Sequence, residues 1–383
     1  MLNFNSQLEK IEQSKIKQFN EFAKNNGVKY NLAIGEPYLD TPKHIKHACI
    51  KSIKNNYTHY APSDGFLDVR DKIAKFENKI NETNYSYNNV IITNGSTESI
   101  TISLLSILNE NDEVILFLPA YNLYRPIIEY LKAKVIAINT EEDQFQINKD
   151  KLVKAVNSKT KAIIINNPNN PTGIVYNNAS CESIVDVIKK YNIWLIIDSV
   201  YEQITFINYN NKLLKEKFIN EKIIICQSFS KSYAMTGWRI GYLIGNKNFI
   251  EQASKLHQLI MVSVNSFIQK TIPAILETDN SAIINKYRIN RDYAYNRLVK
   301  MGLAINKPSG ALYLFPSIKR YNINSWDFCK QLLLKYKTAI LPSICFEIDG
   351  YIRISYCVDF NTLKKALDSL ERFLEKFDST NNI

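Results

Sequence analysis

The segment SFSKSYAMTGWR, residues 228–239, combines residue types that could bind an anion and attack a carbonyl compound. Ser228 and Ser230 offer hydroxyl groups, and Arg239 offers a planar fork of donors, which together suit a phosphate. Lys231 stands among small and hydroxyl residues rather than among other charges. Desolvation and a neighbouring arginine both lower the pKa of a lysine amine, which frees it to act as a Schiff-base nucleophile. The segment predicts a phosphate site beside a reactive amine, and a plain surface lysine is the alternative.

Gly95, Ser96 and Thr97 form a second candidate anion site. They open a helix-like segment, residues 96–108, whose first turn carries free N–H groups and hydroxyls; ordinary helix capping is the alternative. Asp198 ends an apolar run and needs a cation or donors as partners, unless it only caps the following turn. A phosphate cradle, an amine nucleophile and a buried acid together are typical of pyridoxal phosphate held for carbanion chemistry.

Short apolar runs alternate with amphipathic segments between residues 90 and 245. Most runs are too short and too continuously apolar for half-exposed antiparallel strands, so they predict buried strands of a mostly parallel sheet. Segments such as 96–108 and 181–191 have the pattern of helices that cover such a sheet, which indicates an α/β layered fold. The runs are VIIT (90–93), VILFL (114–118), KVIAI (134–138), AIIIN (162–166), IWLIID (193–198), IIICQSF (223–229) and IGYLIG (240–245).

The last hundred or so residues have a different pattern. Strand-like segments within 307–318, 338–346 and 351–357 lie between helical ones, and residues 362–377 form a final helical segment. A helix-like stretch at about 6–24 is expected to join or cap this part. We therefore predict a three-layer α/β/α large domain at 40–275 with a mostly parallel seven-stranded sheet. A smaller α+β domain is predicted from 1–39 and 276–383.

Composition narrows the possible functions. The formal charge is +11, but the lysines are scattered and form no dense basic block, so we expect no nucleic-acid partner. No signal peptide and no run of about 18 apolar residues is present, so no membrane partner is expected. The six cysteines and four histidines have no metal-ligand or disulfide spacing. Free thiols fit a reducing cytoplasm, where we expect the protein to act.

The order of these features resembles a fold-type I, class I/II pyridoxal-phosphate aminotransferase over nearly the whole length. The sequence is most similar to the bacterial subgroup of aromatic and N-acetyl-diaminopimelate aminotransferases. Two patterns, SKxxxMTGWRxG and NPxNPTG, are highly specific. The matching segments are IGEPYLDTP (34–42), HYAPSDGFLDVRDKIA (59–74), TNGSTESI (93–100), LPAYNLY (118–124), NNPNNPTG (166–173), DSVY (198–201), SFSKSYAMTGWRIGY (228–242), KPSGALYLFP (307–316) and YIRIS (351–355).

The resemblance implies a role for each matching residue. Lys231 would carry the cofactor as a Schiff base and move the proton at the substrate α-carbon, and Asp198 would pair with the pyridinium nitrogen. Tyr201 and Asn170 would bond the ring hydroxyl, and Tyr121 would stack on the ring, with a core aromatic as the alternative. The residues expected to hold the phosphate are Gly95, Ser96, Thr97, Ser228, Ser230 and Arg239.

Substrate and partner contacts follow from the same resemblance. Arg353 would bind the substrate α-carboxylate, with Asn170 and the backbone at Gly35 completing that site, and Ile16 would line the pocket. Tyr60 resembles a tyrosine that reaches the phosphate of a neighbouring subunit, which implies a homodimer with shared active sites. The segment 342–350 is shorter than in the family and lacks glycines at Ser343 and Glu347.

The leading hypothesis is ping-pong transfer of the α-amino group of an L-amino acid to a 2-oxo acid such as 2-oxoglutarate. Aromatic or N-acyl-diaminopimelate-like donors are expected from the resemblance. A carbon–sulfur β-lyase, or another eliminating or cyclising enzyme, is the alternative on the same scaffold, because the short 342–350 loop lies near the substrate mouth in the family. A ligand-binding regulator would need an N-terminal DNA-binding domain, and the resemblance begins by about residue 10.

Overall fold

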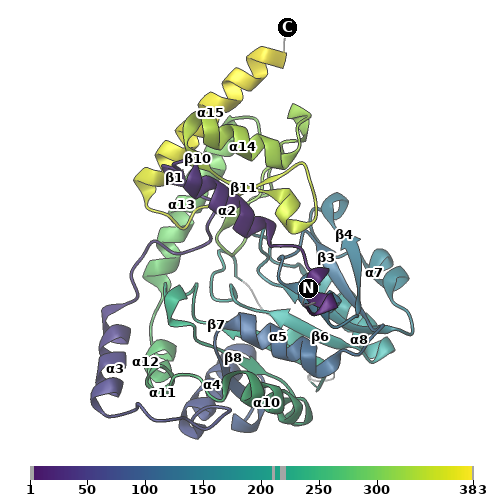
Figure 1. Cartoon of the computed structure of the whole chain (residues 1–383), viewed down its shortest axis with the longest axis vertical. Coiled ribbons are helices and arrows are strands. Elements are labelled where there is room, and N and C mark those ends of the chain that lie inside the picture. Colours follow the sequence, from purple (N-terminus) through teal and green to yellow (C-terminus); the bar gives the residue numbers. More distant parts are fainter. Residues whose placement is uncertain (1–3, 209–211, 216–220, 382–383) are drawn as a thin grey trace.

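The computed structural model describes residues 4–208, 212–215 and 221–381, and a seven-stranded sheet lies at its centre (Figure 1). The strands are ordered β2-β8-β7-β6-β5-β3-β4, and β8 alone runs antiparallel to its neighbours. All seven predicted runs form these strands, which confirms the expected α/β fold with a mostly parallel sheet. Their bounds are β2 Val90–Thr93, β3 Glu113–Leu118, β4 Lys134–Asn139, β5 Thr160–Asn166, β6 Trp194–Asp198, β7 Ile223–Ser228 and β8 Gly241–Ile244.

Alternate residues of each central strand face opposite layers. On one face, Ile164, Ile196 and Ile224 pack with α5 (Ser96–Ile107), α6 (Tyr124–Tyr130) and α10 (Lys247–Met261). Residues such as Ile163 and Ile197 face the other layer, where they belong to the core that includes side chains of α4 (Leu67–Asn81), α7 (Lys149–Ala155) and α8 (Asn178–Tyr191). Both faces are therefore dry, which explains why the strands are continuously apolar rather than alternating.

The C-terminal part forms smaller sheets above the large one (Figure 1). Three short strands pair antiparallel in the order β11-β12-β9, and β1 pairs parallel with β10. Because β1 comes from the N-terminal segment, that segment does lie beside the C-terminal part. The bounds are β1 Tyr30–Asn31, β9 Tyr313–Leu314, β10 Thr338–Ala339, β11 Leu341–Pro342, β12 Ile352–Ser355, α13 Ser281–Lys300, α14 Ser325–Tyr336 and α15 Phe360–Asn381.

Two predicted elements differ in the structure. The N-terminal stretch forms two helices, α1 (Ser6–Glu9) and α2 (Lys15–Asn25), because the Ser14 side chain accepts from Lys17 N and so begins a new helix. The segment 338–346 is not one strand: after β11 the chain turns into the 3₁₀ helix η6 (Ser343–Phe346). The predicted domain limits stay a prediction.

The remaining elements are short or peripheral. Helix α3 (Lys43–Lys54) contacts α11 (Ser266–Gln269) and α12 (Ile272–Leu276) at one end of the molecule, and α9 (Lys212–Lys215) contacts α8. No helix in the described ranges combines the length and apolarity that crossing a bilayer requires. The other 3₁₀ helices are η1 Tyr87–Asn89, η2 Glu141–Asp143, η4 Thr236–Trp238 and η5 Lys319–Tyr321.

A close backbone approach at Gly241 generates a stability prediction. A Cβ atom at this position would lie 2.3 Å from the Gln227 carbonyl oxygen and 3.1 Å from the Gly95 Cα. Gly241→Ala should therefore lower the free energy of unfolding by about 1–3 kcal/mol, the usual cost of overpacking, and lower the melting temperature. Thermal unfolding followed by circular dichroism measures this. Gly237→Ala is the control, since a Cβ at Gly237 meets nothing within 4 Å; equal melting temperatures in the two variants would contradict the argument.

Candidate active site

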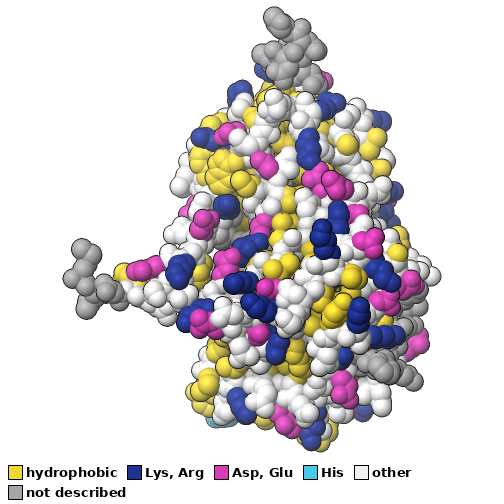
Figure 2. Space-filling model, turned by 90° about the vertical axis from the view of Figure 1, so that its right-hand side faces the viewer, with side chains coloured by type: hydrophobic (Ala, Val, Ile, Leu, Met, Phe, Trp, Pro, Cys, Tyr) yellow, Lys and Arg dark blue, Asp and Glu magenta, His cyan; other side chains and the backbone are white. Residues whose placement is uncertain are grey.

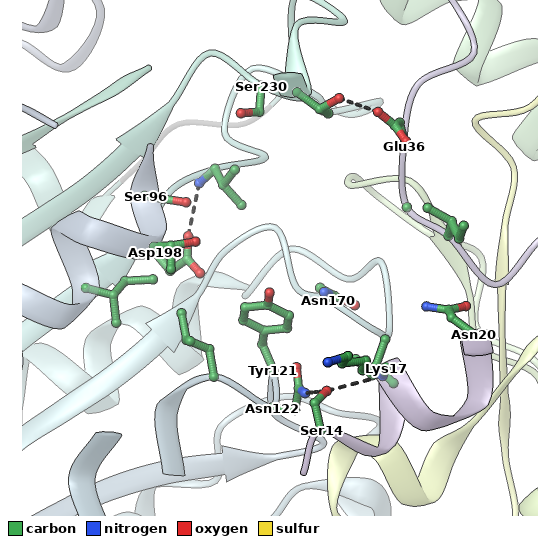
Figure 3. Close-up of a pocket in the computed structure, with 18 of the residues that line it drawn as sticks. Ser14, Lys17, Asn20, Glu36, Ser96, Tyr121, Asn122, Asn170, Asp198 and Ser230 are labelled. Atoms are coloured by element: carbon green, nitrogen blue, oxygen red, sulfur yellow. Dashed lines mark hydrogen bonds between the residues drawn. The ribbon is translucent and has the colours of Figure 1, made fainter. Parts of the chain in front are cut away.

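A cavity of about 1290 Å³ opens at the edge of the sheet where the parallel strands end (Figure 3). Side chains from the N-terminal segment, from the large sheet and from the C-terminal strands line it. Most of the predicted site residues meet here, although they come from nearly the whole length of the chain. Those that line it are Ile16, Gly35, Ser96, Thr97, Tyr121, Asn170, Asp198, Tyr201, Ser228, Ser230, Lys231, Arg239 and Arg353.

One end of the cavity is built to take an anion. Gly95 is the N-cap of α5 with φ of 79°, and no side chain caps that helix end, so its first N–H groups are open to a ligand. A Cβ at Gly95 would lie 2.9 Å from Arg239 Nη2, so a glycine lets the guanidinium approach the turn. Ser228 and Ser230 are buried beside it, with their hydroxyl oxygens 2.9 Å apart.

The Lys231 amine is held away from bulk water. Its Nζ donates to the Gly35 carbonyl oxygen at 2.8 Å. Burial lowers the pKa of Lys231, and the charges of Arg353 and Arg239 lower that pKa further, against an opposing effect of Glu36. A lysine in this setting is neutral more often than a surface lysine, as a nucleophile or base requires.

Asp198 ends β6 and is 3% exposed. Tyr124 donates its hydroxyl to Asp198 Oδ2 at 2.6 Å, whereas Val200 N reaches the other oxygen only at 3.4 Å. Burial raises the pKa of Asp198 to about 6, although both donors oppose that rise. The carboxylate thus keeps a weakly occupied oxygen at the cavity, where a cationic ring nitrogen would be a favourable partner.

Arg353 brings a buried positive charge to the opposite side. Its Nη1 donates to Asn170 Oδ1 at 3.0 Å and its Nη2 to the Ala33 carbonyl oxygen at 2.5 Å, but its buried Nε has no hydrogen-bond partner. The guanidinium lies 4.2 Å from the centre of the Tyr313 ring and 5.1 Å from that of Phe346. An incompletely bonded, aromatic-flanked guanidinium suits a carboxylate ligand.

Two tyrosines that sequence reasoning missed complete the site. Tyr124 is hydrogen-bonded to Asp198. Tyr313 is hydrogen-bonded to the Tyr201 hydroxyl at 2.7 Å, and the Tyr313 ring lies against the Arg353 guanidinium. A Cβ at Gly35 would lie 2.0 Å from the Tyr313 hydroxyl, so these groups pack tightly. Tyr124 and Tyr313 lie in the matching segments LPAYNLY and KPSGALYLFP. The available signal for Tyr124 was its spacing of three residues from Tyr121, just where α6 begins.

Helix α2 lines the cavity, whereas none of residues 342–350, all of which the structure describes, lines it. Asn122 donates to Ser14 at 2.7 Å, and Lys17 and Asn20 of α2 are among the lining residues (Figure 3). The loop is fixed rather than loose at its centre: Ala120 N donates to Phe346 O, and Arg125 Nε donates to Glu347 at 2.8 Å. Glu347 has φ of 67°, the conformation for which glycine is usually needed.

Tyr60 and Gly95 are the predicted site residues that do not line the cavity. Gly95 lies directly behind Ser96, as described above. Tyr60 is 87% exposed and stands outside the cavity of its own chain.

Comparisons with known proteins cover almost all of the chain. The sequence profile of the family Aminotransferase class I and II matches residues 28–370. A probable N-acetyl-LL-diaminopimelate aminotransferase of Bacillus subtilis is 33% identical over 97% of this chain and 96% of its own length. Aromatic-amino-acid aminotransferase 2 of Thermococcus litoralis is 32% identical over 96% and 97%. The crystal structure of aspartate aminotransferase from Thermotoga maritima superposes with a TM-score of 0.93 at 30% identity and covers 97% and 100%.

The Tyr124–Asp198 hydrogen bond generates a pH prediction. The bond lowers the pKa of Asp198, so Tyr124→Phe should raise that pKa above about 6 by roughly one unit, the size expected for a lost bond to a charged acceptor. The carboxyl group would then stay protonated to a higher pH. Infrared difference spectra across a pH titration follow its protonated stretch, and the band absent from Asp198→Asn identifies it. Tyr121→Phe is the control, because its hydroxyl does not bond Asp198; a shift common to both variants would refute this role of Tyr124.

Proposed function

This chain belongs to the aminotransferases of class I and II and is a pyridoxal-phosphate-dependent transaminase, and we propose that it moves the α-amino group of an aromatic or N-acyl-diaminopimelate-like L-amino acid to a 2-oxo acid such as 2-oxoglutarate. The observation that carries this proposal is the meeting of Lys231, Asp198 and Arg353 in one cavity. An amine, an acid and a carboxylate-binding cation are the three groups that amino transfer from an α-amino acid needs.

The residues present fit pyridoxal phosphate. The uncapped start of α5, two buried hydroxyls and Arg239 suit its phosphate group, and a side chain at Gly95 would crowd that cradle. The open oxygen of Asp198 suits its ring nitrogen. Tyr121 lines the cavity with its ring, which suits stacking, and Tyr201 presents a hydroxyl that Tyr313 orients.

Bound there, the cofactor would supply an electron sink that stabilises negative charge at the substrate α-carbon. Lys231, released from the Gly35 carbonyl, would take the proton from that carbon and pass it to the cofactor. The lowered pKa of Lys231 favours this role as a base. Asp198 would hold a proton on the ring nitrogen opposite. Tyr201 and Asn170 would bond the ring oxygen and keep its orientation fixed.

Arg353 would hold the substrate α-carboxylate. The guanidinium lines the cavity, and Asn170 and Tyr313 fix its orientation, so little reorganisation accompanies binding. The Gly35 backbone lies beside it, since Gly35 abuts the Tyr313 hydroxyl. With its carboxylate so held, the substrate directs its side chain towards the cavity mouth, where Ile16 stands.

The cavity lining favours a large, partly apolar side chain. Of the described arginines, those that line the cavity are Arg239, which the phosphate needs, and Arg353. Within a single chain, a short acidic side chain such as that of aspartate therefore finds no second arginine among the described residues of the cavity. Lys17 also lines the cavity and suits a polar group at the far end of a long side chain. Large apolar side chains that line the cavity are Ile16, Ile34, Tyr121, Leu123, Ile127 and Tyr130.

Donor specificity and reaction type can be measured together. Without any 2-oxo acid acceptor, the loaded enzyme should release one equivalent of 2-oxo acid per site from an aromatic amino acid, with no ammonia, and then stop. Aspartate should react more slowly, by roughly tenfold or more for lack of a partner for its second carboxylate. Chemical quench over one turnover is the measurement. Continuous release of ammonia and pyruvate from a cysteine-type substrate would instead mean elimination, and equal rates with aspartate would contradict the donor assignment.

We further propose a homodimer in which each subunit completes the site of the other. Its support is Tyr60, which is 87% exposed and outside its own cavity, although it belongs to a segment that resembles a phosphate contact. Exposed apolar side chains occur nearby on the chain, with Leu67 58% exposed. A subunit contact would cover such side chains.

Mixing two inactive variants tests the shared site. Tyr60→Ala and Lys231→Ala should each lose most activity, and unfolding and refolding them together should recover activity. In a hybrid dimer, the Lys231 of one chain meets the Tyr60 of the other, so one site in two is intact. If Tyr60 served its own chain, every hybrid site would carry one defect, and no recovery would appear.

A further inference from the structure

A buried histidine lies directly behind the anion-binding turn. His257 of α10 is 0% exposed. Its Nδ1 lies 2.6 Å from Glu98 Oε1, and its Nε2 lies 2.9 Å from the Ser63 carbonyl oxygen. Glu98 is itself buried in the first turn of α5, the turn that carries Ser96 and Thr97.

Beside an ionised Glu98, both ring nitrogens of His257 face hydrogen-bond acceptors. A neutral imidazole has a single N–H, whereas a carbonyl oxygen and a carboxylate both only accept. Two donors exist only in the imidazolium ring, so a cationic His257 satisfies both contacts while Glu98 stays ionised. The other Glu98 oxygen accepts from Asn94 N at 2.5 Å, which leaves that carboxylate well bonded.

Glu98 has two opposite effects on the turn. Its bond to Asn94 N fixes the residue before Gly95, and Arg239 Nη2 donates to the Asn94 carbonyl at 3.4 Å, so the carboxylate orders the anion site. Yet a negative charge in that turn repels a phosphate. Asp64 lies in the same loop as Ser63, but Ser254 bonds it and Arg70 stands 3.7 Å away, so its charge has other partners.

We propose that His257 is a positioning residue for cofactor phosphate: as a cation it neutralises Glu98, so that Glu98 can order the Asn94–Gly95 turn without repelling the ligand. His257 touches neither cofactor nor substrate. The proposal rests on the proposed function, because it takes the turn at Gly95, Ser96 and Thr97 as the phosphate site.

Three variants separate charge from structure. In Glu98→Gln, the amide accepts from Asn94 N and donates to a neutral His257, so every contact is satisfied without charge. In Glu98→Gln/His257→Gln, the second amide accepts from the first and donates to Ser63, again with every contact satisfied. In His257→Gln alone, the new amide can donate to Glu98 only by turning its oxygen towards the Ser63 carbonyl. That variant therefore leaves an anionic Glu98 without its counter-charge.

The full chain is tested by its preference for pyridoxal phosphate over pyridoxal, taken as the ratio of their dissociation constants. His257→Gln should reduce that ratio by roughly tenfold or more, the effect of an uncompensated charge near the phosphate. Glu98→Gln and the double variant should stay within about threefold of the wild type, since their contacts are satisfied. An unchanged ratio in His257→Gln, or a double variant as weak as His257→Gln, overturns the proposal.

Two further results keep the outcome interpretable. If the wild type shows no preference for the phosphorylated compound, or Arg239→Gln retains it, the phosphate site of the proposed function fails rather than this inference. If His257→Gln does not fold, nitrogen NMR of histidine-labelled wild type decides. The His257 signals, identified by their change in Glu98→Gln, should be those of an imidazolium at neutral pH. A neutral ring in the wild type overturns the proposal.

Discussion

The site depends on charges that have been taken out of water. Asp198 and Arg353 are 3% and 4% exposed, and such groups are costly unless hydrogen bonds and opposite charges surround them. In each case the protein supplies part of the partners, through Tyr124 for the acid and Asn170 for the guanidinium, and both side chains line the cavity, where a ligand can supply further ones. Asp198 is held at the end of β6 in the seven-stranded sheet, and Arg353 is held in β12 of the three-stranded sheet. Cofactor and substrate thus enter a site whose polar groups are already ordered.

The space-filling view shows how little of this chemistry is visible from outside. Lysine, arginine, aspartate and glutamate side chains are interspersed over the face shown in Figure 2, with apolar side chains between them. A net charge of +11 is therefore spread out rather than gathered on that face. Asp198 and Arg353, by contrast, are charges that the fold has buried.

Much of the fold could be predicted because a strand buried on both faces of a sheet is apolar at nearly every position. The seven apolar runs follow that pattern, and each is a strand. The N-terminal helix was harder, because Ser14 interrupts a periodic stretch by capping rather than by any change in hydrophobicity. At 343–346 the local apolar pattern suits a strand, but the chain turns there, and Phe346 lies near Arg353.

Tyr124 and Tyr313 were missed because their functions lie in contacts with Asp198 and Tyr201, which are distant in sequence. The Glu98–His257 pair joins residues on separate helices, and no spacing rule signals such a contact.

The parallel pairing of β1 with β10 has a consequence for how the protein is made. Tyr30 lies beside Thr338, so the first strand of the chain waits for a partner that the ribosome adds roughly 300 residues later. The strands of the large sheet, residues 90–244, are synthesised well before Thr338 and can pair with one another before β10 exists. Gly35 and Arg353 can come together only after residue 353 has been synthesised. A nascent chain that ends before residue 353 can thus possess its large sheet and Lys231 while still lacking the guanidinium proposed to hold an amino acid.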